Sequence, residues 1–182
     1  RALKFLPALV LTLGIEYANA AFMANQADWL NSHFVLVAFV PIISAIAGNI
    51  GLQTSSSITA YLNVRKDEGE GETGVWPLLR ELFPTYMAHS LPNVLIMAVL
   101  MTAVVFTLEA SNDPCQFNHA SIVFIGSLVN MLVASAMGIL TPVIAHSYNY
   151  DPSTVAGPFE TALQDVIGFI FFLWMAKTVI DQ

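Results

Sequence analysis

The sequence predicts an all-α membrane protein in which residues 1–182 form a single domain with five transmembrane helices. Of these residues, 56% are hydrophobic and only 10% are charged, whereas a soluble domain averages about 25% charged residues. Five apolar stretches are each long enough to cross a hydrocarbon core of about 30 Å as a helix. Their continuous apolar character argues against the alternating strands of a β-barrel. The expected spans cover residues 4–24, 34–62, 83–109, 120–147 and 157–180.

The basic residues predict the orientation of these spans. When the spans cross the membrane alternately in chain order, five of the six basic residues lie on one side of the membrane, namely Arg1, Lys4, Arg65, Lys66 and Arg80. The connections at residues 25–33 and 111–119 contain none. Because basic residues concentrate in cytoplasmic loops, we expect a cytoplasmic N-terminus and a C-terminus outside. The protein is therefore expected to be a multi-pass protein of the plasma (inner) membrane.

The first three expected spans differ in polar content. The span at residues 4–24 is interrupted by one glutamate, and the span at residues 34–62 carries no charge and exceeds the length of one crossing. A glycine-rich acidic loop at residues 63–80 follows, which we interpret as a solvated linker or a low-affinity collector of cations. Its apolar end, at residues 75–82, predicts a short helix in the membrane interface before the span at residues 83–109 begins.

The last two spans carry the other polar groups. The span at residues 120–147 has His119 beside it and His146 at its far end, whereas the span at residues 157–180 contains Asp165. The four histidines share no helical spacing, and no zinc motif is present. The single cysteine, Cys115, excludes an internal disulfide.

Asp165 is the strongest candidate for a functional residue. An ionisable side chain inside a membrane costs about 2.5–3.5 kcal/mol and usually faces a cavity or a partner. No Lys or Arg lies inside another span, so we expect a cation from outside the chain, or else a protonated aspartic acid that bonds to another helix. Helical spacing places Gly157, Thr161 and Gly168 on the face of Asp165. The opposite side is expected to carry Phe169, Phe171, Phe172 and Trp174.

The second span carries a matching polar stripe. Ala45, Asn49, Gln53 and Ser57 follow one another at intervals of four residues. Buried amides need hydrogen-bond partners, and the waters of a hydrated ion would supply them. Small residues at Gly48 and Gly51 permit close helix approach, which we interpret either as ordinary packing or as a dimer contact.

The ion that suits these groups is a divalent cation. Mg²⁺ gives up its waters reluctantly and is usually held by one or two carboxylates, whereas Ca²⁺ prefers more direct oxygen ligands. One aspartate and several amides fit Mg²⁺, but these residues do not distinguish Mg²⁺ from Mn²⁺ or Co²⁺. A net charge of −7 favours cations and excludes a nucleic acid partner. Glu16 could line the same path or have a structural role. An intramembrane hydrolase would need a second catalytic group beside Asp165, so no enzyme is predicted.

Two longer patterns resemble those of the MgtE-type magnesium transporters. Residues 40–53 read VPIISAIAGNIGLQ, which is similar to the family pattern PxxxxxxGNxGxQ. Residues 151–168 read DPSTVAGPFETALQDVIG, which is similar to the pattern DPxxxxGPxxxxxxDxxG. Both occur in the family's order, and the resemblance covers essentially the whole chain.

The resemblance implies a homodimer in the lipid bilayer with an ion path along its two-fold axis, lined by the second and fifth spans. It places a largely hydrated Mg²⁺ at Asp165, with Asn49 and the backbone near Ala45 and Thr161 facing the ion. The same resemblance places Asp151 near the cytoplasmic mouth. Further pore-lining or mouth residues are expected at Gln53, Gly48, Gly157 and Glu16.

The sequence differs from the bacterial pattern in two respects. It contains no cytoplasmic regulatory domain, so we expect such a domain to be absent or to precede Arg1. Its acidic loop is longer than expected, and Glu16 has no clear family counterpart. An alternative function is therefore a coupled exchanger of Mg²⁺ for Na⁺ or H⁺, in which Glu16 or Asp165 titrates.

Overall fold

The computed structural model describes residues 6–67, 74–108, 116–150, 152 and 157–180, and every regular element among them is helical. The predicted all-α class is therefore confirmed. The helices are α1 (Leu6–Ala24), α2 (Ala27–Ser32), α3 (Phe34–Asp67), α4 (Val75–Leu108), α5 (Gln116–Ser147) and α7 (Pro158–Ile180).

Four of these helices are long and apolar enough to cross a membrane. Within the described residues they cover Phe34–Arg65, Val75–Leu108, Phe117–Ser147 and Phe159–Ile180. The apolar part of α1, Leu9–Ala24, is shorter than these segments. The fifth span therefore stays a prediction, as does the orientation of the termini.

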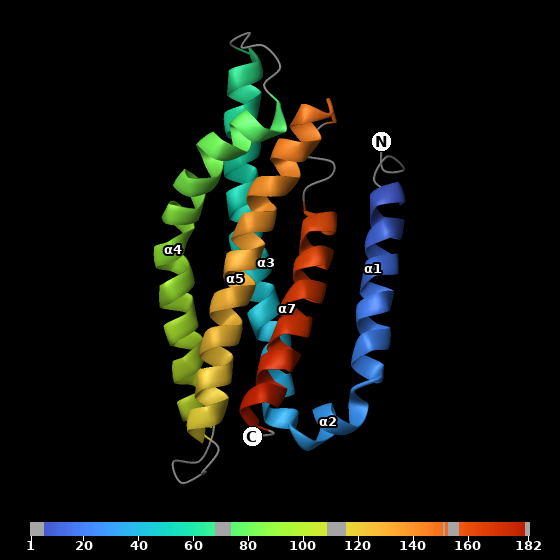
Figure 1. Ribbon diagram of the computed structural model, residues 1–182, viewed down its shortest axis with the longest axis vertical. Coiled ribbons are helices and arrows are strands. Elements are labelled where there is room, and N and C mark those ends of the chain that lie inside the picture. Colours follow the sequence, from blue (N-terminus) through green and yellow to red (C-terminus); the bar gives the residue numbers. More distant parts are fainter. Residues whose placement is uncertain (1–5, 68–73, 109–115, 151, 153–156, 181–182) are drawn as a thin grey trace.

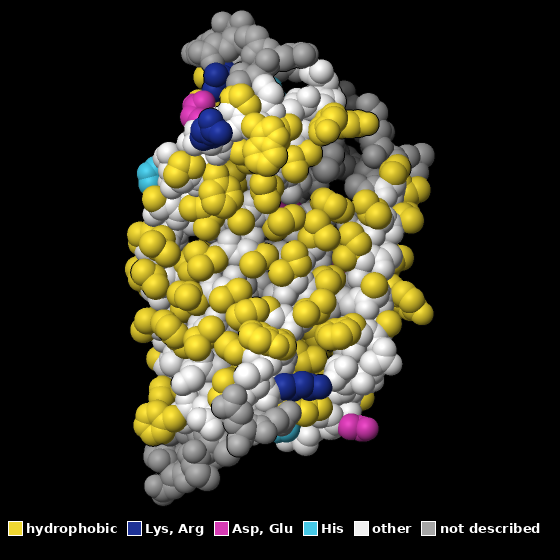
Figure 2. Space-filling view, in the orientation of Figure 1, with side chains coloured by type: hydrophobic (Ala, Val, Ile, Leu, Met, Phe, Trp, Pro, Cys, Tyr) yellow, Lys and Arg dark blue, Asp and Glu magenta, His cyan; other side chains and the backbone are white. Residues whose placement is uncertain are grey.

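The long helices run up and down alternately (Figure 1). The start of α1, the end of α3, the start of α4, the end of α5 and the start of α7 lie at one end of the bundle, which we call the inner end. Hydrophobic side chains cover the middle of the visible face, and charged side chains lie toward its two ends (Figure 2). This distribution is typical of a helical bundle that faces lipid.

The connection between α3 and α4 differs from the prediction. Residues 63–67 continue α3 and residues 75–80 begin α4, so much of the expected loop is helical. Residues 75–82 are helical, as predicted, but they form the first turns of α4 and not a helix of their own. Figure 1 shows that these turns lie at an angle to the rest of α4, which contains Pro84. A proline removes a helical hydrogen bond and bends a helix in this way.

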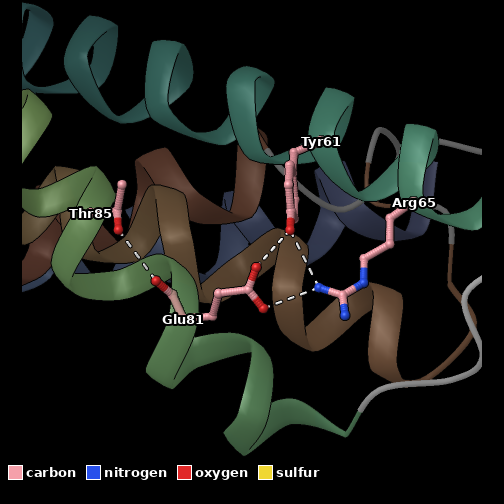
Figure 3. A network of polar contacts seen from close by, with 4 residues as sticks. All are labelled: Tyr61, Arg65, Glu81 and Thr85. Carbon is pink, nitrogen blue, oxygen red and sulfur yellow. Dashed lines mark hydrogen bonds and ion pairs between the residues drawn. The ribbon is translucent and has the colours of Figure 1, made fainter.

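A polar network joins the two helices at the inner end (Figure 3). Tyr61 donates a hydrogen bond of 2.6 Å to Glu81, and the Arg65 guanidinium lies 3.1 Å from the same carboxylate. Arg65 also donates to the Tyr61 hydroxyl at 3.3 Å. These contacts fix the end of α3 to the bent start of α4.

Helix α2 was not predicted, since its residues were expected to form a loop. Lys177 on α7 contacts it twice. Its Nζ donates a hydrogen bond to Gln26 Oε1 at 2.5 Å and lies 5.6 Å from the centre of the Trp29 ring. Trp29 in turn stacks on His33 with ring centres 4.1 Å apart. The short helix thus closes the outer end between α1 and α3.

Helix α5 occupies the centre and packs against α3, α4 and α7, whereas α1 packs mainly along α7. None of the described α1 side chains is fully buried. Because lipid is as apolar as leucine, contacts between spans depend on close packing rather than on the hydrophobic effect. The backbones of α3 and α5 approach each other closely, since a Cβ added at Gly138 would lie 2.5 Å from the Gly51 carbonyl oxygen.

Candidate functional site

Asp165 lies on α7, partly exposed, and α3 holds its carboxylate in place. Ser44 Oγ on α3 donates a hydrogen bond of 2.5 Å to Asp165 Oδ1. Gln164 Nε2 donates to the same oxygen at 3.2 Å and to the Ser44 carbonyl oxygen at 3.3 Å. Two neutral donors therefore orient the carboxylate without neutralising its charge.

The carboxylate borders a cavity of about 420 Å³ between α1, α3 and α7. None of the residues that line this cavity is a lysine or an arginine. Phe169 also lines it, although the sequence placed this residue on the opposite side of the helix. That prediction was wrong because Phe169 follows Asp165 by four residues, which is about one helical turn. The lining residues are Asn19, Met23, Phe34, Val37, Ala38, Val40, Pro41, Ser44, Asp165 and Phe169.

The other aromatic residues of α7 divide between two environments. Phe172 is buried and lies where a Cβ at Gly126 would come within 2.5 Å of its ring, whereas Trp174 is exposed. Gly168 meets the Asn130 side chain, which leaves no room for a Cβ. The small residue at this position therefore serves helix packing against α5.

Glu16 approaches the site from α1. Its carboxylate interacts electrostatically with that of Asp165 and accepts a hydrogen bond from Asn19, a residue that lines the Asp165 cavity. The structure therefore brings Glu16 into the neighbourhood of Asp165. Across the described residues, no cluster of three or more His, Cys, Asp or Glu side chains is arranged to hold a metal ion directly.

The polar stripe of α3 lies on a different surface. Ala45, Asn49, Gln53 and Ser57 are all exposed in the single chain, and none of them lines the Asp165 cavity. One chain therefore does not bring the whole predicted set together.

Gly48 faces inward, in contrast to its neighbour Asn49. A Cβ at Gly48 would contact Gln164 and the Thr161 side chain at 3.9–4.0 Å, so Gly48 packs against α7 within the chain. Thr161 itself is partly exposed. Asp151 lies outside the described residues.

A second cavity, of about 460 Å³, lies on the half of α3 near the inner end. Gly157 lines it and has a φ of +86°, a conformation that favours glycine because it has no Cβ. Pro158 then begins α7, where its fixed φ suits the first helical position. The lining residues are Leu52, Ser55, Ser56, Thr59, Ala60, Asn63 and Gly157.

Glu160 was missed by the sequence analysis. It is 1% exposed, and its carboxylate lies between α3 and α5, where a Cβ at Gly51 would meet its Oε1 at 2.6 Å. It lies in the first turn of α7, and nothing in the local sequence indicates that it is buried. Ser44 and Gln164 were missed as supports of Asp165 because a serine or an amide in a span predicts no specific partner.

Comparisons with known proteins agree with the two sequence patterns. Residues 40–175 match the MgtE family, which is described as a divalent cation transporter. The chain is 26% identical over 181 residues to the magnesium transporter MgtE of Bacillus subtilis (strain 168), which covers 100% of this chain and 38% of that protein. It is 25% identical over 176 residues to the magnesium transporter MgtE of Enterococcus faecalis, and the match covers 97% of this chain and 36% of that protein. The chain thus spans little more than a third of the length of these relatives.

Proposed function

The chain belongs to the MgtE family of divalent cation transporters, and from that premise we propose that it carries Mg²⁺ across the membrane. Two relatives named as magnesium transporters support this cargo. Four apolar helices support a location in the bilayer. Transport requires a charged or polar station inside these helices, and Asp165 supplies one.

The observation that carries the proposal is the unneutralised carboxylate of Asp165 at the open cavity between α1, α3 and α7. Ser44 and Gln164 fix its orientation, and no basic side chain lines the cavity. A carboxylate in a low-dielectric environment attracts a cation strongly. Mg²⁺ suits a single carboxylate because it keeps most of its waters, which can bond to nearby amides and hydroxyls.

We further propose that two copies of the chain complete the path. Asn49 and Gln53 are exposed on a helix that spans the bilayer, where lipid offers amides no hydrogen bonds. A second copy related by a two-fold axis would cover this stripe with its own. In that arrangement the ion would pass between the α3 and α7 helices of both copies, with Asn49, Thr161 and the backbone near Ala45 facing it. We also propose that this path prefers Mg²⁺ to Mn²⁺ and Co²⁺.

Mg²⁺ uptake into proteoliposomes tests the role of Asp165. The Asp165→Asn variant keeps the shape of the side chain and removes its charge, so we expect uptake to collapse. Asp28→Asn is a matched control because it removes one exposed carboxylate on α2, outside the cavity, and it should transport normally. Equal uptake by the Asp165→Asn variant and the unaltered chain would exclude Asp165 as the ion station.

A coupled exchanger is a second candidate, and the interaction between Glu16 and Asp165 favours it. Two nearby carboxylates could bind Mg²⁺ in one step and Na⁺ or H⁺ in the next. Such an exchanger requires that Mg²⁺ flux follow an imposed Na⁺ or pH gradient. Mg²⁺ flux that is independent of both gradients would exclude the exchanger and retain the uncoupled pathway.

A further inference from the structure

A further cavity, of about 460 Å³, lies on the first turns of α4 at the inner end. Leu78 and Leu82, on another side of the same turns, are buried in a cluster with side chains of α3 and α5. The cavity therefore faces away from the bundle, in contrast to the one at Asp165. Its lining residues, all of them exposed, are Trp76, Pro77, Arg80 and Glu81.

The surroundings place this cavity at the boundary between acyl chains and lipid headgroups. Beyond it, α4 exposes large apolar side chains at Phe83, Leu91, Leu95, Ile96, Val99 and Leu100. Such a surface suits contact with acyl chains. Trp76 and Tyr148 are strongly exposed at the inner end, and aromatic side chains of this kind concentrate at the level of the headgroups. Basic side chains lie beside hydrophobic ones at this end of the visible face (Figure 2).

The two charged groups at this cavity differ in their contacts. The Glu81 carboxylate is engaged at both oxygens, because Oε1 accepts the Tyr61 hydrogen bond and Oε2 pairs with Arg65 at 3.1 Å (Figure 3). Arg80, by contrast, forms no hydrogen bond or ion pair within the described part of the chain. A guanidinium presents its N–H donors as a planar fork that matches the oxygens of a phosphate group. The cavity thus offers an unpaired cation at the depth of the headgroups.

We propose that Arg80 and Trp76 bind the phosphate of an anionic phospholipid whose acyl chains lie along the exposed face of α4. Arg80 pairs with the phosphate, and the Trp76 indole N–H can donate a second hydrogen bond at the same depth. A zwitterionic lipid suits the site less well, because its own ammonium group brings a second positive charge close to Arg80. The site lies on α4, away from Asp165, so this inference does not depend on the proposed transport function.

The fluorescence of Trp76 in vesicles tests the proposal. The other two tryptophans of the full chain, Trp29 and Trp174, are replaced by phenylalanine so that Trp76 alone is observed. Vesicles of phosphatidylcholine contain either brominated phosphatidylglycerol or brominated phosphatidylcholine, and bromine quenches a nearby indole. We expect phosphatidylglycerol to bind beside Trp76 about fivefold more strongly than phosphatidylcholine, which is the effect of one basic residue near an anionic lipid surface.

Three variants in this background identify the group that causes the preference. Arg80→Gln should reduce the ratio of the two lipid affinities to about one, whereas Arg80→Lys keeps the charge and should retain most of the preference. Lys177→Gln is the matched control, because it removes one cation at the outer end and should leave the quenching of Trp76 unchanged. The acidic residues between α3 and α4 are identical in all of these variants.

Four results would overturn the lipid site. They are equal quenching by the two brominated lipids, a preference that survives Arg80→Gln, an equal loss in Lys177→Gln, and a preference that inorganic phosphate abolishes. The third would reduce the effect to the net charge of the protein, and the fourth would indicate a site for free phosphate instead. Because Arg80 is exposed and forms no contact that holds the helices together, we expect its variants to fold.

Discussion

Replacing Gly138 by alanine tests the close contact on which the bundle depends. A Cβ at this position would lie 2.5 Å from the Gly51 carbonyl oxygen and 3.1 Å from both Glu160 Oε1 and Thr54 Cβ. The nearest of these atoms belongs to the backbone, so no side chain can rotate away to make room. Optimal contacts lie at about 3.5 Å, and α3 and α5 would have to separate by roughly 1 Å.

The expected cost follows from two opposing terms. Overpacking a tight interface costs about 1–3 kcal/mol, whereas replacing a helical glycine by alanine gains about 1 kcal/mol. Because the nearest atom is backbone that cannot rotate away, the upper part of the overpacking range applies, about 2–3 kcal/mol. We therefore expect Gly138→Ala to lower the free energy of unfolding by about 1–2 kcal/mol. For a chain of this size, each kcal/mol shifts the unfolding midpoint by about 2–4 °C, so the midpoint should fall by about 2–8 °C.

Gly48→Ala is the matched control in the same thermal unfolding assay in detergent. A Cβ at Gly48 would meet its nearest neighbours at 3.9–4.0 Å, which is ordinary van der Waals contact. We expect its midpoint to stay unchanged or to rise slightly. A midpoint for Gly138→Ala at or above that of the unaltered chain would refute the close approach, and equal losses in both variants would refute the distinction between the two glycines.

Two further predictions concern the ion path. Ser44→Ala removes a hydrogen bond to the Asp165 carboxylate and should lower Mg²⁺ flux in proteoliposomes by about tenfold. Ser44→Thr keeps the hydroxyl and should retain the flux. Equal flux in the two variants would contradict a role of Ser44 in positioning Asp165. In a Cys115→Ser background, Asn49→Cys should cross-link two chains under mild oxidation, because Asn49 is exposed on the proposed dimer face, whereas Ile96→Cys, exposed on α4, should remain uncross-linked. Equal cross-linking at both positions would exclude that face.

The sequence predicted the long helices well because their signal is continuous. An uninterrupted apolar run has few structures available inside a membrane, so α3, α5 and α7 begin and end within a few residues of expectation. The connection at residues 63–80 was predicted less well. Its glycines and charges indicated a loop, but the pairing of Arg65 and Tyr61 with Glu81 supports helix on both sides of residues 68–73. Such pairing depends on tertiary contacts that local composition does not encode.

The candidate site shows the same limit at the level of single side chains. Asp165 could be identified because a carboxylate inside an apolar run is rare and costly. Glu160 lies only five residues away, but its burial depends on the notch that Gly51 and Gly138 leave between α3 and α5. A notch formed by two helices that are distant in sequence has no signature in either one.

The GNIGLQ segment of α3 places residues that pack between helices next to residues that we propose face the ion. Gly48 and Gly51 face inward. A Cβ at Gly51 would lie 2.6 Å from Glu160 Oε1 on α7 and 3.1 Å from the Ala134 carbonyl oxygen on α5, whereas a Cβ at Gly48 would make only ordinary contacts. Asn49 and Gln53 lie on the exposed face of the same turns. Substituting Gly51 would therefore push against Glu160 of α7 and against α5, whereas substituting an amide would leave the bundle intact and change only the surface proposed to face the ion. Variants at these two kinds of position should thus separate in stability measurements before any flux is recorded.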